Sequence, residues 1–171
     1  MPSRRSPRSL ASFVQVYSGF LLCIIGIVLS LYAFHVETKK ETDQEYTALC
    51  DISDRISCSK VFTSKYGRGF GLVTPILGEQ SFLNVPNSIY GLIFYSLQMY
   101  LCTVHTKNGT LFQLLTSVIS LGGCAYLAFI LYFVLEDACI VCISTYIVNI
   151  LLFLINVWKW SLVSGAKRKS D

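Results

Sequence analysis

The chain has 171 residues, of which 53% are hydrophobic and 14% charged, with a net charge of +4. Soluble domains usually carry about 25% charged residues, so the composition excludes an ordinary soluble domain and indicates a single membrane domain over residues 1–171. The basic residues gather at the two ends, in SRRSPR and AKRKS. Nucleic-acid binding would need a basic face, which this pattern does not provide.

Four apolar segments are long enough to cross a lipid bilayer, which takes about 20 helical residues. They predict an all-α integral membrane fold, a four-transmembrane-helix bundle with a luminal loop or cap between the first two helices. The predicted spans are residues 10–36, 86–105, 111–135 and 138–163. The first segment is longer than the apolar part of a signal peptide and has no clear cleavage site, so we expect it to be retained.

The basic residues near the span ends predict the orientation, because cytoplasmic loops are enriched in Lys and Arg. They lie before the first span, at Lys107 between the second and third, and in the tail 164–171, whereas the third connection holds Glu136 and Asp137. We therefore expect both termini and the turn containing Lys107 in the cytosol. The loop 37–85 and the third connection would then face a lumen.

Two short motifs bear on this orientation. The C-terminal KRKSD resembles the dilysine signals that retrieve proteins to the endoplasmic reticulum, although a basic flank after a span has the same composition. Asn108-Gly109-Thr110 is a glycosylation sequon. We expect it to stay unmodified, because it lies in a short turn on the cytosolic side, and its glycosylation would overturn the topology.

The predicted luminal loop has three parts. VETKKETDQEYTALC contains enough helix-forming residues for a short helix ending near Cys50, and CDISDRISC then places Cys50 and Cys58 eight residues apart. The glycines of GRGFG neither follow a buried strand nor open a helix, so they do not indicate a phosphate site. We expect a tight turn there that folds the apolar residues 70–76 over a pocket at membrane level. Pro86 suits the first turn of the second span.

The seven cysteines fall into two groups. Three lie inside predicted spans, where small apolar packing is the expected role: Cys23, Cys102 and Cys124. The other four all belong to the luminal end: Cys50, Cys58, Cys139 and Cys142. Their spacing fits zinc poorly, so we expect no metal. Four cysteines allow three pairings, and either static disulfides or a redox pair is compatible with the sequence.

The Cys139-x-x-Cys142 motif favours redox chemistry. Asp137 is expected to cap the fourth span, which would place Cys139 in its first turn and Cys142 one turn later. Unpaired N–H groups and the helix dipole favour a thiolate at such a position, although the neighbouring acids oppose it. Two cysteines on one helix face can close a strained and therefore labile disulfide.

Polar residues continue along the same helix face. Tyr146 follows Cys142 by one turn and Asn149 lies three residues further, while Asn87 opens the second span at the same predicted depth. Polar side chains inside spans are costly and tend to be functional. A thiol beside two hydrogen-bond donors in an apolar pocket would suit a membrane-soluble electron acceptor with carbonyl oxygens, such as a quinone.

These residues resemble the vitamin K epoxide reductase family. The matching stretches cover nearly all of residues 28–150: LSLYAFHVE, ALCDISDRISCSKVF, GRGFGL, NSIYGLIFYSLQ, YLAFILYFVL and CIVCISTY. One departure is Tyr66, where the family usually has Trp before GRGFG. Within the family, HVE, PNS and GLIFY favour a paralogue of the main enzyme, whereas ISCSKVF favours the main enzyme.

The resemblance implies an endoplasmic reticulum membrane enzyme that reduces vitamin K 2,3-epoxide to the quinone and then the hydroquinone, with no tightly bound cofactor. It implies that Cys142 engages the substrate and then forms a disulfide with Cys139. Cys50 would attack that disulfide at Cys139, and Cys58 would resolve the exchange. A luminal thioredoxin-fold protein would donate the electrons.

The resemblance also implies the binding residues. Asn87 and Tyr146 would hold the substrate oxygens and those of coumarin anticoagulants such as warfarin. Four further side chains would line the apolar pocket: Phe62, Tyr90, Leu127 and Leu131.

Two alternatives stay open at this point. A disulfide-generating enzyme that uses another quinone, without epoxide chemistry, would need the same residues. A claudin-like structural protein also has four spans and two spaced loop cysteines, but it would have a large second loop in place of the short third connection found here.

Overall fold

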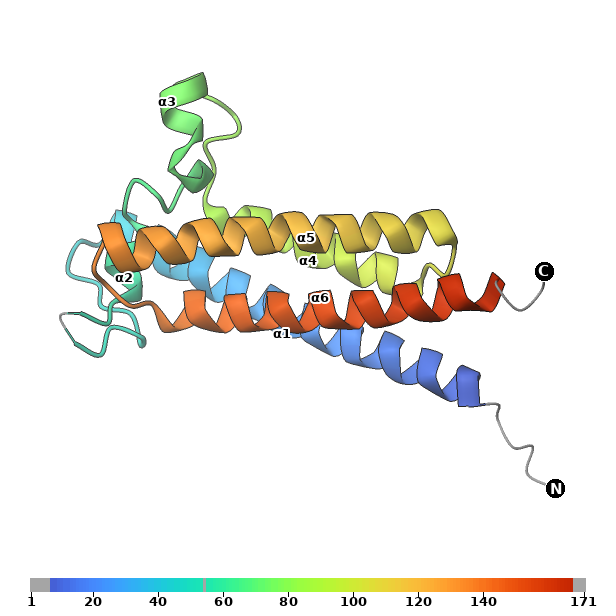
Figure 1. Ribbon diagram of the computed structural model, residues 1–171. Coiled ribbons are helices and arrows are strands. Elements are labelled where there is room, and N and C mark those ends of the chain that lie inside the picture. The colour runs from blue at the N-terminus through green and yellow to red at the C-terminus, as the bar shows by residue number, and fades with distance from the viewer. Residues whose placement is uncertain (1–6, 54, 168–171) are drawn as a thin grey trace.

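A computed structural model describes residues 7–53 and 55–167. The described part of the chain is mostly helical, with isolated β-bridges and no β-strand. Four long helices lie side by side (Figure 1): α1 (Pro7–Thr42), α4 (Asn87–Thr103), α5 (Lys107–Phe129) and α6 (Ile140–Lys167). Four of the basic residues that predict the orientation lie outside the described residues, namely Arg4, Arg5, Arg168 and Lys169. Residues 168–171 of the C-terminal KRKSD motif lie outside them as well.

Three of these helices are long and apolar enough to cross a membrane, namely Ala11–Thr42, Lys107–Val134 and Ile140–Gly165. The helix α4 overlaps the predicted second span and has 17 residues. It begins at Asn87, so Pro86, which was expected in the first turn, is instead the residue that precedes the helix. The long helices carry many exposed apolar side chains, as expected for a surface that faces lipid.

The first helix is longer than the predicted first span, and the predicted short helix ending near Cys50 does not form. The first helix continues without a break through Thr42, and no Gly or Pro lies between residues 27 and 42. The hydroxyls of Thr38 and Thr42 bond back to carbonyls four residues earlier within this last part of the helix. The following residues form turns rather than a helix ending at Cys50. The α1 helix therefore reaches beyond its most apolar part.

The third span also differs from its prediction. It begins at Lys107, where the Thr106 hydroxyl accepts a hydrogen bond from the Gly109 N–H and caps the helix. After Phe129 it widens into a π-helical turn, Ile130–Val134, in which the Leu135 N–H donates to the Ile130 carbonyl. Such widened turns are often found at functional sites.

The four helices are not packed equally against one another. The helix α1 packs closely against α4 and α6, and α5 packs closely against α6, whereas α4 and α5 make few contacts with each other. The bundle is therefore closed on three sides and loosely packed between α4 and α5.

The segment 43–86 covers one end of the bundle, which we call the cysteine end (Figure 1). It contains the short helices α2 (Cys58–Phe62) and α3 (Val73–Leu77) and the 3₁₀ turn η1 (Gly69–Gly71). The helix α3 stands away from the bundle beside α4 and α5. Both described ends of the chain lie at the opposite end, which we call the terminal end.

A buried polar layer joins all four helices near the terminal end, and the sequence analysis missed it. Its members are Gln15, Gln98, Gln113, Asn156 and Lys159, each at most 1% exposed. The Lys159 ammonium donates to the carbonyls of Leu101 (2.6 Å) and Cys102 (3.2 Å) and to Gln113 Oε1 (2.9 Å). A cation at the carboxyl end of α4 offsets the helix dipole and pairs carbonyls that the helix leaves open.

Candidate active site

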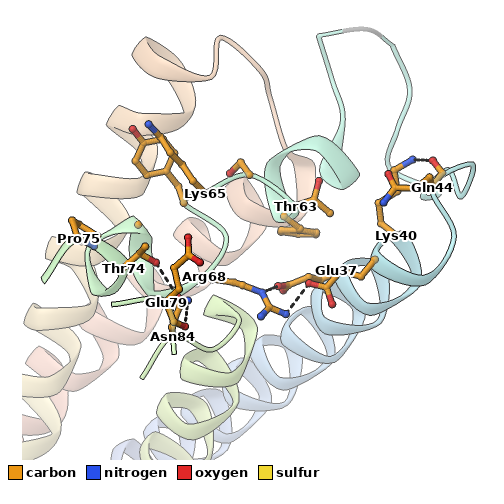
Figure 2. Close-up of a pocket in the computed structure, with 15 residues that line it drawn as sticks. Glu37, Lys40, Gln44, Thr63, Lys65, Arg68, Thr74, Pro75, Glu79 and Asn84 are labelled. Atoms are coloured by element: carbon orange, nitrogen blue, oxygen red, sulfur yellow. Dashed lines mark hydrogen bonds and ion pairs between the residues drawn. The ribbon is translucent and has the colours of Figure 1, made fainter. Parts of the chain in front are cut away.

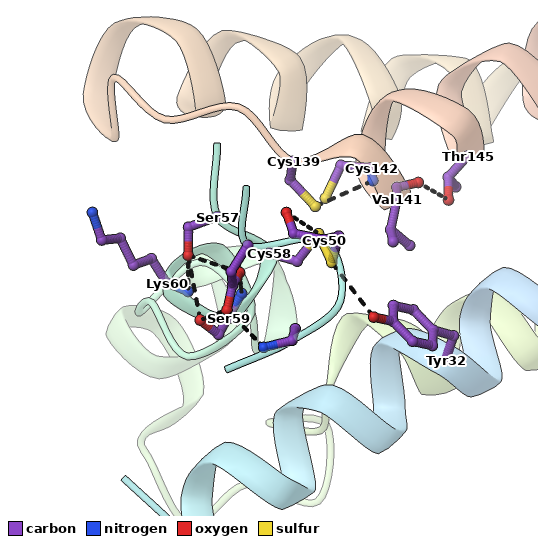
Figure 3. The surroundings of a disulfide bond; sticks show 12 residues. Tyr32, Cys50, Ser57, Cys58, Ser59, Lys60, Cys139, Val141, Cys142 and Thr145 are labelled. Carbon is purple, nitrogen blue, oxygen red and sulfur yellow. Dashed lines mark hydrogen bonds between the residues drawn. A yellow bond between two sulfur atoms is a disulfide. The ribbon is translucent and has the colours of Figure 1, made fainter. Parts of the chain in front are cut away.

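Four cysteines gather at the cysteine end (Figure 3). Cys50 and Cys58 form a disulfide with their Cα atoms 5.8 Å apart, and Cys139 and Cys142 carry free thiols. Cys50, Cys58 and Cys139 belong to one buried cluster, against which Cys142 packs. The partition of the cysteines expected from the sequence is therefore also a spatial grouping.

Asp51 anchors the loop that carries the disulfide. Its carboxylate accepts hydrogen bonds from the Ala48 N–H (2.8 Å), the Ser57 hydroxyl (2.9 Å) and both the N–H (3.0 Å) and hydroxyl (2.6 Å) of Ser59. Partial burial raises the pKa of Asp51, but these hydrogen bonds outweigh it and lower the pKa to about 2. Asp51 was not predicted as a site residue. The only signal in the sequence is that it directly follows Cys50 and that Ser57 and Ser59 flank Cys58.

Backbone pairing brings this loop against the start of α6. The Ala138 N–H donates to the Arg55 carbonyl (2.7 Å), and the Ser57 N–H donates to the Ala138 carbonyl (3.0 Å). Cys58 and Cys139 each follow one of these paired residues, and both are completely buried. Cys50 is 8% exposed, and its sulfur accepts a hydrogen bond from the Tyr32 hydroxyl at 3.7 Å.

The expected capping of α6 by Asp137 is wrong. The helix begins at Ile140, so Cys139 lies just before its first turn, and the Cys139 sulfur accepts a hydrogen bond from the Cys142 N–H (3.3 Å). The Asp137 carboxylate instead lies 4.0 Å from the Lys60 ammonium. The thiol itself therefore occupies the capping position, where open N–H groups favour a thiolate.

An apolar cavity of about 710 Å³ runs from this end between the helices. Its wall includes Cys142 and all six side chains that the resemblance implied for binding: Phe62, Asn87, Tyr90, Leu127, Leu131 and Tyr146. Cys139, Cys50 and Cys58 are not part of the wall. The wall therefore includes one of the four clustered sulfurs, that of Cys142, together with the free thiol of Cys124 from α5, and the other three clustered sulfurs lie outside the wall.

The side chain of Asn87 holds the cap above the cavity. Its Nδ2 donates to the Tyr66 carbonyl (2.6 Å), and its Oδ1 accepts from the Phe70 N–H (2.8 Å). Its own N–H donates to the Gly67 carbonyl (2.8 Å). Nδ2 has two hydrogens, so one remains for a ligand. The hydroxyl of Tyr146 bonds to no residue in the described part of the chain.

A second, polar hollow of about 830 Å³ lies outside the cap (Figure 2). Arg68 extends from the cap to α1, with its Nε 3.1 Å from Glu37 Oε1 and its Nη2 2.7 Å from Glu41 Oε1. Glu37 lines both the hollow and the apolar cavity. These two ion pairs were not predicted from the sequence, because Glu37 and Glu41 lie 31 and 27 residues before Arg68 in the chain.

Among the residues that the structure describes, no group of three or more His, Cys, Asp or Glu side chains could hold a metal ion.

Comparison with known proteins identifies the family. The model of the vitamin K epoxide reductase family matches residues 19–157. Vitamin K epoxide reductase complex subunit 1 of Mus musculus is 49% identical over 138 residues, which cover 81% of this chain and 86% of that protein. The protein of the same name from Rattus norvegicus is 48% identical over the same shares. The chain therefore belongs to the vitamin K epoxide reductase family.

Proposed function

We propose that this chain reduces vitamin K 2,3-epoxide to the quinone and then to the hydroquinone with electrons from luminal thiols. The observation that carries the proposal is the position of Cys142, which lies in the wall of an apolar cavity and packs against the cluster that holds the other three sulfurs. The names of its mouse and rat relatives support the substrate. Membership of this family argues against the claudin-like alternative.

The proposal includes a fourth span and the predicted orientation. The 17 residues of α4 reach about 26 Å at 1.5 Å per residue, close to the roughly 30 Å of a hydrocarbon core. Its close packing against α1 supports a crossing at the same depth. We assign the cysteine end to the lumen of the endoplasmic reticulum and both termini to the cytosol, with residues 37–85 forming the luminal cap and 164–171 the basic tail.

Cys142 is the proposed nucleophile. Its thiolate attacks a ring carbon of the epoxide, the carbon–oxygen bond breaks, and the oxygen takes a proton. Cys139 then loses its proton and attacks the sulfur of Cys142, which forms the disulfide and leaves two electrons on the ring. These electrons expel the hydroxyl, which takes up the second proton and departs as water. Hydrogen bonds from Tyr146 and from the second hydrogen of Asn87 would stabilise the charge that develops on the substrate oxygens.

The contacts at the cysteine end favour an order for the electron relay. The resemblance implied that Cys50 attacks the disulfide at Cys139. However, the pairing of Ser57 with Ala138 supports Cys58 as the neighbour of Cys139, and Cys50 is the more exposed of the two loop cysteines. We therefore propose that Cys58 attacks the Cys139 sulfur and releases Cys142. Cys50 then attacks the Cys58 sulfur and releases Cys139, and the resulting Cys50–Cys58 disulfide is reduced from the lumen.

The loose contact between α4 and α5 suggests the route to the cavity. The wall there is built from residues of both helices, including Ile93, Leu97, Ile119 and Gly123. An apolar substrate tail could leave the site directly into lipid between them. Coumarin anticoagulants would compete for the same wall and for the hydrogen bonds of Asn87 and Tyr146.

The decisive experiment is turnover of vitamin K epoxide by purified full-length protein with a small membrane-permeant dithiol. Cys142→Ser should abolish turnover with any reductant, whereas Cys23→Ser, a buried cysteine outside the cavity, should retain it. Normal turnover by Cys142→Ser would contradict the mechanism.

The same assay with ubiquinone separates the two redox candidates. Turnover of ubiquinone without turnover of the epoxide would favour the alternative enzyme that generates disulfides with another quinone. Cys50→Ser and Cys58→Ser should keep turnover with the small dithiol and lose it with a thioredoxin-fold donor, because only the loop pair connects the cavity thiols to a protein.

A further inference from the structure

Two large apolar side chains flank Cys50 and are exposed at the cysteine end. Leu49 is 91% exposed and Ile52 is 66% exposed, whereas Cys50 between them is 8% exposed and its partner Cys58 is completely buried. Their loop lies at the end of the bundle, past the start of α6, rather than along its sides (Figure 1). In the proposed orientation these side chains face the aqueous lumen, so lipid contact does not account for their exposure.

The exposure of Leu49 is a consequence of a well-anchored turn. Leu49 and Cys50 are the central residues of a turn closed by a hydrogen bond from the Asp51 N–H to the Ala48 carbonyl (3.0 Å). The Asp51 carboxylate holds the other side of this turn through the Ala48 N–H. On the far side, the Ile52 N–H donates to the Ile56 carbonyl (2.9 Å). The backbone therefore holds both side chains outward on either side of Cys50, the less buried half of the disulfide.

We propose that Leu49 and Ile52 form the docking contact for the dithiol protein that reduces the Cys50–Cys58 disulfide. The inference rests on the proposed function, which requires such a partner at this disulfide. The partner is a thioredoxin-fold protein with an apolar rim around its reactive cysteine. Apolar side chains that are already held in place bind with a smaller loss of conformational entropy than mobile ones.

The electron transfer balances at this contact. The partner's thiolate attacks the Cys50 sulfur, a mixed disulfide forms, and Cys58 leaves as a thiolate next to Cys139. The partner's second thiol then attacks its own sulfur in the mixed disulfide and releases Cys50. The partner becomes a disulfide, and the loop pair gains two electrons with their protons. The hydroxyl of Tyr32, which donates to the Cys50 sulfur, stabilises Cys50 as it leaves.

The test measures reduction of the Cys50–Cys58 disulfide in the full-length protein without any quinone, by rapid acid quenching and alkylation of the freed thiols. Reduced thioredoxin and dithiothreitol are the two probes. The double variant Leu49→Ser/Ile52→Ser should slow the second-order reaction with thioredoxin about 10-fold, as expected for the loss of two interface anchors. Its reaction with dithiothreitol should stay unchanged.

Leu77→Ser is the matched control, because Leu77 is an exposed apolar residue of α3 outside this loop. It should react with both probes as the wild type does. An unchanged thioredoxin rate in the double variant would overturn the proposal, and so would a parallel loss with both probes, since that indicates a damaged loop. Because no substrate is present, failure of the proposed vitamin K chemistry would show separately, as absent turnover in the wild type with a small dithiol.

Discussion

The two ends of the bundle differ in how their buried polar groups are paired. At the terminal end, the Lys159 ammonium has three acceptors, one of them on Gln113, although Gln15 Nε2 and Asn156 Oδ1 of the same buried polar layer have no partner among the described residues. Toward the cysteine end, the hydroxyls of Ser88 and Tyr95 are buried at the cavity wall and have no partner among the described residues. A buried cation with three acceptors fixes the helices that supply them, whereas a cavity wall with open hydrogen-bonding groups can accept a ligand.

A change in the buried polar layer should have the largest effect on stability. Lys159→Met should lower the free energy of unfolding by about 3 kcal/mol or more, because each buried group left without a partner costs about 1–3 kcal/mol. Thermal unfolding in detergent measures the loss. Lys107→Met, at an exposed residue of the same end, should unfold like the wild type. Equal stability of the two variants would remove the distinction between the ends.

Asn87→Ala tests the wall of the cavity. The change removes the two hydrogen bonds that hold the backbone of Tyr66 and Phe70, together with the donor proposed for the substrate. Substrate and coumarin binding should weaken by about 1–3 kcal/mol. Inhibitor titration measures it, and limited proteolysis of residues 63–72 reports whether the cap has also loosened. Unchanged affinity would contradict the proposed role of Asn87.

Paired glycine substitutions compare the packing of the two regions. A Cβ at Gly19 would lie 2.8 Å from the Cys102 sulfur, whereas a Cβ at Gly123, on the cavity wall, would meet nothing within 4 Å. Gly19→Ala should therefore destabilise the bundle by about 1–2 kcal/mol. Gly123→Ala should be neutral or stabilise it by up to about 1 kcal/mol, since alanine favours helix. Both are measured by thermal unfolding, and a loss of stability in Gly123→Ala would mean that the wall is closed.

The smallest expected effect is a dependence on pH at the disulfide loop. The pKa of Asp51 is about 2 in the folded protein, below the usual value of about 3.9 in an unfolded chain. The carboxylate therefore contributes its stabilisation above about pH 4 and loses it as the pH falls toward 2. Proteolysis of residues 43–57 by an acid-active protease should accelerate over this window. In Asp51→Asn the acceleration should be absent, and an acceleration equal to that of the wild type would exclude Asp51 as its cause.

The amino-acid sequence by itself determined the membrane class, the approximate positions of the long apolar helices and the division of the cysteines. These features follow from local composition and from the length that a bilayer requires. The six substrate-binding residues implied by the resemblance, from Phe62 to Tyr146, also line one cavity. Neither inference needed a knowledge of contacts between distant segments.

Only the tertiary structure decided which groups meet. The pairing of Ser57 with Ala138 depends on how the cap lies against α6, and it left Asp137 without the capping role that local sequence suggested. Lys159 reads as an ordinary basic residue near the end of a span, yet carbonyls from α4 and an amide from α5 surround its ammonium. Local sequence fixes helix length and polarity, but hydrogen-bond partners far apart in the chain are chosen by the packing of the helices.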